Sequence, residues 1–257
     1  MGGEDELQRR LWPATETVLT AARAQASLLG MFFGLADPAG GEAWRPAGEL
    51  YSVYSADPGG SAGEAGPAGE SPLDSLINEV SRKLSGCERR VAASLFLSGY
   101  SARLLAPQVG CLVLAGCIPA VPATRLRWRQ PRTEMIELAL PPGPGWCAPD
   151  PILINLVISQ TFDEHVEPLT AAIKARVRIS ADLLRDNVAS ALIGAIRLLD
   201  AQLSQDWRAL AAQVLAHPRL AGCGTLQAGE PAFIRRSCCL YYQVEDGGLC
   251  GDCPLAR

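Results

Sequence analysis

The last twenty residues carry the pattern with the clearest chemistry. Cys238 and Cys239 are adjacent, Cys250 and Cys253 follow, and together they form the spacing C-C-x10-C-x2-C. Thiols gathered this closely are costly as unpaired, partly buried groups, whereas thiolates bound to iron or zinc are stabilised. A strand over residues 240–244 and a turn over 245–248 would fold the second pair back onto the first. We therefore expect these four cysteines to hold a metal centre.

Two metals suit such a group of thiols. Zinc sites are generally built from two C-x2-C or similar pairs, whose thiolates converge on one ion. Adjacent cysteines point in different directions along an extended chain, so Cys238 and Cys239 suit a cluster with two irons better than a single ion. The spacing favours a [2Fe–2S] cluster and leaves zinc as the alternative.

The other cysteines lack the spacing of metal ligands. Cys111 and Cys117 lie in apolar sequence and are expected to be buried small hydrophobic side chains. Cys223 precedes the adjacent pair by fifteen residues and is kept as a candidate spare ligand. Cys87 and Cys147 are assigned no role.

The two histidines favour structural roles. His165 stands beside acidic residues, which on paper could form a metal site with it. We expect instead a solvated acidic turn with a structural histidine, although a substrate-pocket role stays open. His217 precedes Pro218 at a helix end, where it can interact with the last carbonyls.

Two further motifs are weighed against known sites. Residues 59–63 match G-x-S-x-G, but no strand precedes them and Gly and Pro follow, so a hydrolase is not indicated. The chain has neither G-x-G-x-x-G nor a P-loop lysine, so electrons are expected to come from another protein rather than from a bound nucleotide.

One basic–aromatic segment occurs near the middle of the chain. Arg125, Arg127 and Arg129 share one face of a predicted strand, with Trp128 on the other and Arg132 just beyond it. We expect an ordinary amphipathic edge strand. The alternative is a surface for an anionic ferric complex or an acidic ferredoxin.

Composition narrows the class of protein. The 257 residues are 48% hydrophobic and 19% charged, with a net charge of −4 and a pI near 5.3, which predicts a soluble globular protein without the long-range attraction of a generic nucleic-acid binder. Nine cysteines are too few for a disulfide scaffold, and the number is odd. No apolar run reaches the roughly 20 residues needed to cross a bilayer, and no secretion signal is evident. We therefore expect a cytoplasmic protein, whose thiols stay reduced.

The elements that would position these residues are mostly helices. The fold class expected is α+β, mainly helical, with a small β-hairpin near 125–140 and a compact C-terminal cluster-binding segment. The predicted helices cover residues 5–33, 73–84, 88–106 ending before Pro107, 109–115, a long stretch from Asp150 that is interrupted at Pro168, 182–203 and 206–216. A short strand is expected near 50–54. The expected organisation is an N-terminal helix over 1–33, a Gly/Pro-rich loop or linker over 34–72, a mainly helical domain over 73–222 and a cluster-binding module over 223–257.

The tail resembles the C-terminal iron–sulfur motif of the FhuF-type ferric-siderophore reductases, a bacterial family that ends in C-C-x10-C-x2-C. The similarity includes Arg-Arg-Ser before the adjacent pair, Leu-Tyr-Tyr after it and Cys-Gly-Asp-Cys-Pro at the end. Weaker similarity extends upstream to about residue 85, at 96–107, 165–169 and 187–189. Arg185 departs from the family, whose members often carry Trp two residues before Asn187.

This resemblance implies that Cys238, Cys239, Cys250 and Cys253 hold a [2Fe–2S] cluster. It also implies a cytoplasmic enzyme that reduces iron(III) bound to a hydroxamate-type siderophore, with a protein such as ferredoxin or flavodoxin as electron donor. Arg235 and Arg236 would place positive charge beside the anionic cluster, favouring its reduced form or docking an acidic donor. The alternatives are a non-catalytic electron-transfer or iron- and redox-sensing protein with the same cluster, and a structural zinc module.

Overall fold

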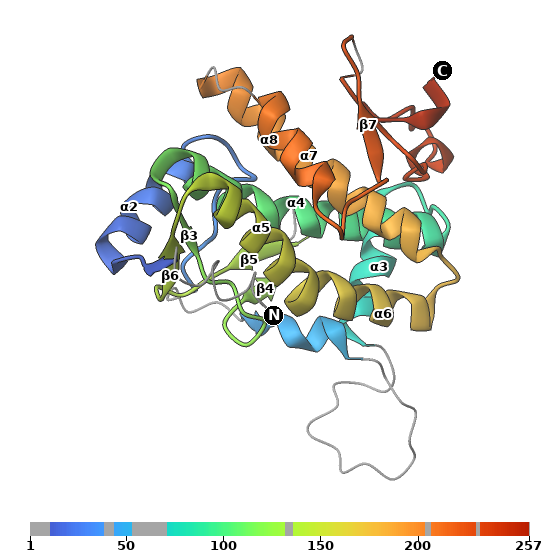
Figure 1. Ribbon diagram of the computed structural model, residues 1–257. Coiled ribbons are helices and arrows are strands. Elements are labelled where there is room, and N and C mark those ends of the chain that lie inside the picture. The colour runs from blue at the N-terminus through green and yellow to red at the C-terminus, as the bar shows by residue number, and fades with distance from the viewer. Residues whose placement is uncertain are drawn as a thin grey trace.

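A computed structural model describes residues 11–38, 44–52, 71–131, 136–203, 207–229 and 232–256. Figure 1 shows a mostly helical molecule with small antiparallel sheets, which confirms the expected α+β class. Strands β3 (Cys117–Pro119) and β6 (Gly145–Cys147) lie beside α2 (Glu16–Ser27), while β7 (Gly224–Leu226) and the C-terminal turns lie on the opposite side of the molecule. None of the described helices is long and apolar enough to span a bilayer.

The centre of the molecule is one long helix, α4 (Arg89–Ala115), which packs against α2, α3 (Pro72–Lys83), α5 (Asp150–Thr161) and α7 (Ala181–Leu203). The expected break at Pro107 is wrong, because the helix continues through it. An interior proline costs about 3 kcal/mol. Residues on both sides of Pro107 are buried, so tertiary packing outweighs this local cost. The helix ends at Gly116, which adopts the left-handed conformation with φ 57°.

Most of the other helices confirm the sequence pattern. α7 and α8 (Trp207–Ala216) lie where expected, and α5 is followed by a π-helical segment, η2 (Phe162–Val166), before α6 (Glu167–Arg176). Residues 5–10 of the first predicted helix lie outside the described residues. The remainder is shorter than predicted, because Thr15 caps α2 by accepting a hydrogen bond from the Val18 amide, and residues 12–13 pair as strand β1.

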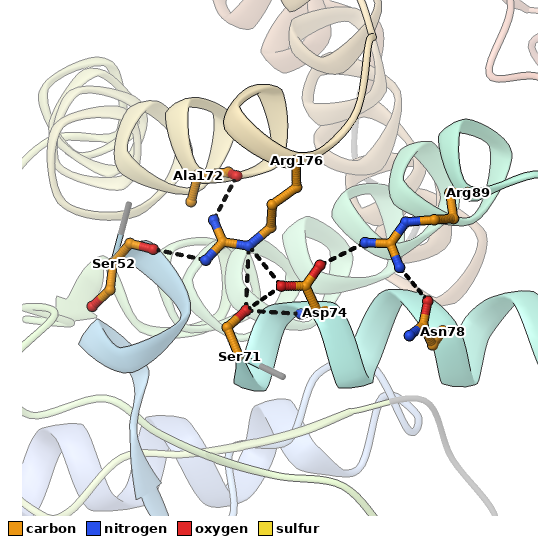
Figure 2. A network of polar contacts seen from close by, with 7 residues as sticks. All are labelled: Ser52, Ser71, Asp74, Asn78, Arg89, Ala172 and Arg176. Carbon is orange, nitrogen blue, oxygen red and sulfur yellow. Dashed lines mark hydrogen bonds and ion pairs between the residues drawn. The ribbon is translucent and has the colours of Figure 1, made fainter. Parts of the chain in front are cut away.

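The helix predicted after Ser71 is confirmed as α3, with Ser71 as its cap. Figure 2 shows how this helix start is held: Arg176 of α6 donates to Ser71 Oγ, Asp74 Oδ2 and the Ser52 and Ala172 carbonyls, while Arg89 of α4 binds the other oxygen of Asp74. Burial works to raise the pKa of Asp74, but hydrogen bonds from Ser71, Arg89 and Arg176 lower it overall. One carboxylate thus joins α3, α4 and α6.

The strand predicted near 50–54 is wrong where the structure describes it. Residues 47–51 form a 3₁₀ helix, η1 (Ala47–Tyr51), whose Ala47 and Leu50 are fully buried. The tight turn lets both apolar side chains face the core, which an alternating strand would not allow. The G-x-S-x-G segment at 59–63 lies outside the described residues.

The sheets are short. One has the order β1 (Trp12–Pro13), β6 (Gly145–Cys147), β3 (Cys117–Pro119), and another the order β2 (Arg45–Pro46), β4 (Arg127–Arg129), β5 (Glu137–Ala139). The hairpin predicted near 125–140 is confirmed, with Trp128 opposite Leu138. Its first strand is not an edge strand, however, because β2 pairs with its other side. A third pair, β7 (Gly224–Leu226) and β8 (Phe233–Arg235), leads into the C-terminal cysteines.

Candidate metal centre

Strand β8 ends at Arg235, three residues before the adjacent cysteines. The predicted strand over 240–244 is wrong: Leu240 has a left-handed backbone with φ 71°, and residues 241–243 form the 3₁₀ turn η3 (Tyr241–Gln243). A Cβ on Gly247 would lie 2.6 Å from the Tyr241 carbonyl oxygen, so the returning chain passes too closely for any larger residue. The second cysteine pair does fold back onto the first, as expected, but through a tight turn rather than a hairpin.

The four thiols lie as two pairs. Cys239 Sγ and Cys250 Sγ are 3.6 Å apart, and the Cys238 thiol interacts with that of Cys253. Among the described residues, no three His, Cys, Asp or Glu side chains form a group that could hold a metal ion. A tetrahedral zinc site needs its ligands converging on one point, whereas a two-iron cluster needs two ligands at each iron. Two pairs of thiols suit the second requirement.

Each sulfur accepts a backbone N–H from the residue two positions later. Leu240 N lies 3.3 Å from Cys238 Sγ and Leu255 N lies 3.4 Å from Cys253 Sγ. The amides of Tyr241 and Asp252 serve Cys239 and Cys250 in the same way. A neutral thiol is a weak acceptor. Four sulfurs each with an amide donor therefore form a set suited to thiolates.

Arg235 brings a buried positive charge to the same place. Its side chain is 3% exposed, and its Nη2 donates to Cys250 Sγ at 2.7 Å. A hydrogen bond from Cys250 and the Arg235 charge lower the pKa of Cys239 to about 5, although burial opposes this, and the pKa of Cys250 is raised because it holds the proton that the two sulfurs share. Arg235 Nε is buried without a hydrogen-bond partner. A cluster sulfur would supply the missing acceptor, so the donor set fits an anionic iron–sulfur group.

Helix α7 holds this segment through one polar face. Its buried Asn187 accepts from Arg235 Nη1 at 2.6 Å and donates to Ser94 Oγ of α4 at 2.8 Å. Ser94 Oγ in turn donates to the Cys239 carbonyl at 2.7 Å. The cysteine segment is therefore tied to the two central helices, and no local pattern around Ser94 predicts this contact.

Further contacts from α7 reach the residues beside the cysteines. Asp186, fully buried, accepts from the Ser237 amide at 3.0 Å and from its hydroxyl at 2.5 Å. Ser190 Oγ donates to Asp252 Oδ2 at 2.5 Å, and Arg197 pairs with the other oxygen of Asp252 at 3.4 Å. The signal available in the sequence was the presence of polar residues at helical spacing on an otherwise apolar helix.

A groove adjoins this anchoring face. It lies between α4 and α7, has a volume of about 580 Å³, and is lined largely by small side chains, including Ser98, Ala102, Gly194, Ala195 and Ala201. Ser190 and Arg197 line it as well as binding Asp252, which stands between Cys250 and Cys253. The groove therefore reaches the segment that carries the second cysteine pair.

The remaining predicted residues take structural places. Arg236 is exposed and pairs with Asp186 at 3.3 Å rather than with a sulfur. Cys111 and Cys117 are buried as expected, and Cys223 packs in the main hydrophobic core. Arg129 pairs with Glu137, and the other described arginines of the basic segment donate to backbone carbonyls. Arg132 lies outside the described residues.

His165 is structural, but its surroundings are not solvated. It is fully buried, and its Nε2 donates to the Val121 carbonyl at 2.6 Å. Its Nδ1 must then accept, from Tyr51 OH at 2.6 Å, and Tyr51 OH accepts from Tyr100 OH at 2.5 Å. His217 accepts from the Arg219 amide and contacts Ser159 Oγ.

Residues 235–255 match a family model described as the FhuF 2Fe-2S C-terminal domain. No curated protein matches the chain. The matched segment contains all four paired cysteines and Arg235, and the match indicates a [2Fe–2S] cluster. The match covers this C-terminal segment alone, and an iron–sulfur domain of this kind is consistent with an oxidoreductase.

Proposed function

We propose that this protein is a cytoplasmic ferric-siderophore reductase that passes one electron to chelated iron(III) and releases iron(II). In this proposal Cys238, Cys239, Cys250 and Cys253 hold a [2Fe–2S] cluster in a module over 223–257, which α7 of the helical domain anchors. The observation that carries the proposal is the pairing of the four thiols, each with an amide donor, within a segment that matches the FhuF 2Fe-2S C-terminal domain.

The chemistry requires little besides the electron. Hydroxamate oxygens are hard donors that hold iron(III) tightly and iron(II) poorly, so one-electron reduction weakens the chelate. A [2Fe–2S] cluster supplies one electron at a time. No general acid, base or nucleophile has to be placed beside the iron, which agrees with the neutral, structural state of His165.

The surroundings of the cysteines suit electron exchange with another molecule. Tyr241, Tyr242, Leu249 and Leu255 are 36–53% exposed and stand within three residues of a cysteine. The ligand segment therefore lies near the surface, within an apolar rim typical of contact surfaces. The electron donor in this proposal is a separate protein such as ferredoxin or flavodoxin.

The groove between α4 and α7 is where we place the chelate. Its volume of about 580 Å³ suits a compact small-molecule ligand, and its small side chains leave the helix backbones accessible. Ser190 and Arg197, at its wall, bind the residue between Cys250 and Cys253. A ferric complex in this groove would lie next to the electron source.

The proposal is tested by single-turnover reduction under anaerobic conditions. The dithionite-reduced protein, freed of excess reductant, is mixed with a ferric trihydroxamate, and iron(II) is trapped while the visible spectrum is recorded. We expect one iron(II) per reoxidised cluster. A protein that contains iron and sulfide and reoxidises with ferricyanide but not with the hydroxamate is the electron-transfer or sensing alternative. A colourless protein with one zinc contradicts both.

The groove is tested by Gly194→Trp. A Cβ at Gly194 meets nothing within 4 Å, so a large side chain can project into the groove without a clash at its first atom. We expect at least a tenfold rise in KM for the ferric hydroxamate, with the cluster spectrum and the ferricyanide rate unchanged. Gly194→Ala is the matched control, because it makes the same backbone change without filling the groove. Equal KM values for the Trp and Ala variants would contradict the assignment.

A further inference from the structure

We propose that Cys239 and Cys250 share one iron of the cluster, that Cys238 and Cys253 share the other, and that Arg235 directs the added electron to the Cys239/Cys250 iron. This inference rests on the part of the proposed function that places a [2Fe–2S] cluster on the four cysteines. It does not depend on the identity of the electron acceptor.

The pairing follows from how the chain divides the adjacent cysteines. Two thiolates on one tetrahedral metal, with metal–sulfur bonds of about 2.3 Å, lie roughly 3.8 Å apart. Cys239 Sγ and Cys250 Sγ are 3.6 Å apart, close to that separation. Cys238 and Cys253 are then the two ligands left for the other iron, and their thiols also interact. Each iron would thus take one ligand from the C-C pair and one from the C-x2-C pair.

The two pairs differ in the charge beside them. Arg235 Nη2 donates to Cys250 Sγ at 2.7 Å, while Nη1 is fixed by Asn187 at 2.6 Å. The sulfurs of Cys238 and Cys253 accept backbone amides, which carry no net charge. A guanidinium stays protonated at any pH of interest, so this asymmetry is permanent.

The direction of the effect follows from the electron balance. A [2Fe–2S] cluster held by these four cysteines would accept one electron from the protein donor, and one of its irons would pass from iron(III) to iron(II). The same electron later leaves for the chelated iron(III). Positive charge and hydrogen bonds at the sulfurs stabilise the reduced state, so the iron ligated beside Arg235 is the one that becomes ferrous.

Cys→Ser variants at all four positions test the pairing. Serinate oxygen disfavours the ferrous state. Cys239→Ser and Cys250→Ser should therefore share one set of EPR g-values and a large fall in midpoint potential, while Cys238→Ser and Cys253→Ser share a second set and a smaller fall. Any other grouping overturns the pairing. If a variant loses its cluster, NMR of the reduced wild-type protein decides the pairing. The β-protons of Cys239 and Cys250 should then show the paramagnetic shifts typical of ligands to ferrous iron.

Arg235→Gln tests the electron placement. We expect the reduced-to-oxidised ratio at a fixed potential to fall about tenfold, which is about 59 mV for one electron. Arg236→Gln is the matched control, because it removes the same charge one residue later from an exposed side chain that binds Asp186. Equal shifts of the midpoint potential in Arg235→Gln and Arg236→Gln overturn the assignment. Arg235→Lys keeps the positive charge and should lower the midpoint potential less than Arg235→Gln does.

A measurement on the unaltered protein guards against loss of the cluster in Arg235→Gln. With ¹⁵N-labelled arginine, pulsed EPR of the reduced state should detect a guanidinium nitrogen coupled to the cluster, and no coupling overturns the assignment. A wild-type protein without iron and sulfide would refute the cluster itself. An intact cluster with the wrong grouping or no nitrogen coupling would refute this inference alone.

Discussion

His165 illustrates how burial decides the role of a residue that the sequence places among charges. Burial lowers its pKa, although the Val121 carbonyl and the nearby Glu164 oppose the shift. The hydrogen bond that its Nδ1 accepts from Tyr51 requires the neutral ring. The folded protein therefore resists taking up a proton that the unfolded chain accepts below its ordinary pKa of about 6.5.

This difference predicts a loss of stability in mild acid. Because the pKa is lower in the folded state, the contribution is present above pH 6.5 and is lost as the pH falls, at up to about 1.4 kcal/mol per pH unit. Urea unfolding at pH 7.5 and 5.5 measures it, and His165→Gln should flatten the dependence. His217→Gln is the control, because His217 is the other of the two histidines in the chain and is partly exposed. A slope unchanged in His165→Gln would contradict the prediction.

At the level of residues, the candidate ligands could be predicted from the sequence, but the residues that hold them in place could not. Cysteine spacing identifies Cys238, Cys239, Cys250 and Cys253, because few residue types perform this chemistry. Asn187 and Ser94 are polar residues on helices, and only the fold reveals that they meet beneath Arg235. A contact between residues 93 positions apart leaves no local pattern.

At the level of elements, local signals predicted helix starts better than helix continuity. Ser71 and Asp74 form a cap that is present in the structure as predicted. Pro107 is a strong local stop signal, yet α4 continues because it is buried on both sides. Leu240 has no sequence signal for a left-handed backbone, so a strand was predicted where a 3₁₀ turn forms.

The network in Figure 2 predicts a stability effect at this scale. The side chain of Arg176 is 9% exposed. It donates to the carbonyl of Ser52, which follows η1, and to acceptors at the start of α3 and in α6. Arg176→Gln should lower the free energy of unfolding by about 2 kcal/mol, because buried acceptors lose a charged donor. Urea unfolding provides the measurement.

Arg89→Gln is the matched control for this prediction. Arg89 binds the same Asp74 carboxylate, but its side chain is 42% exposed, so the loss should lie within about 1 kcal/mol. Equal losses of unfolding free energy in Arg176→Gln and Arg89→Gln would contradict the prediction that the buried contacts of Arg176 contribute more to stability.

At the level of the whole molecule, the helical core and the cysteine segment differ in what stabilises them. The helices bury a large continuous core of Leu, Ile, Val and Phe side chains. Residues 238–256 contain two 3₁₀ turns and bury few side chains, among them Cys239, Val244 and Cys253. Bound iron would therefore contribute most of the order in this segment.

Removal of the cluster should loosen one part of the chain. In hydrogen–deuterium exchange of apo and loaded protein, we expect faster exchange over about residues 236–256 in the apo form, with α4 and α5 unchanged. The polar face of α7 should show a smaller increase, because it loses the partners that it anchors. Unfolding of the entire chain on iron removal would contradict this separation.

The polar face of α7 also has a consequence for comparing genomes. Asp186, Asn187, Ser190 and Arg197 form the pattern D-N-x2-S-x6-R, and each contacts a residue within three positions of one of the four C-terminal cysteines. Among other chains that end in C-C-x10-C-x2-C, those that carry this helix pattern should seat the tail in the same orientation. Chains with the cysteines but another helix pattern would need a different way to dock the same tail, so the helix pattern predicts the orientation of the tail where the cysteines alone do not.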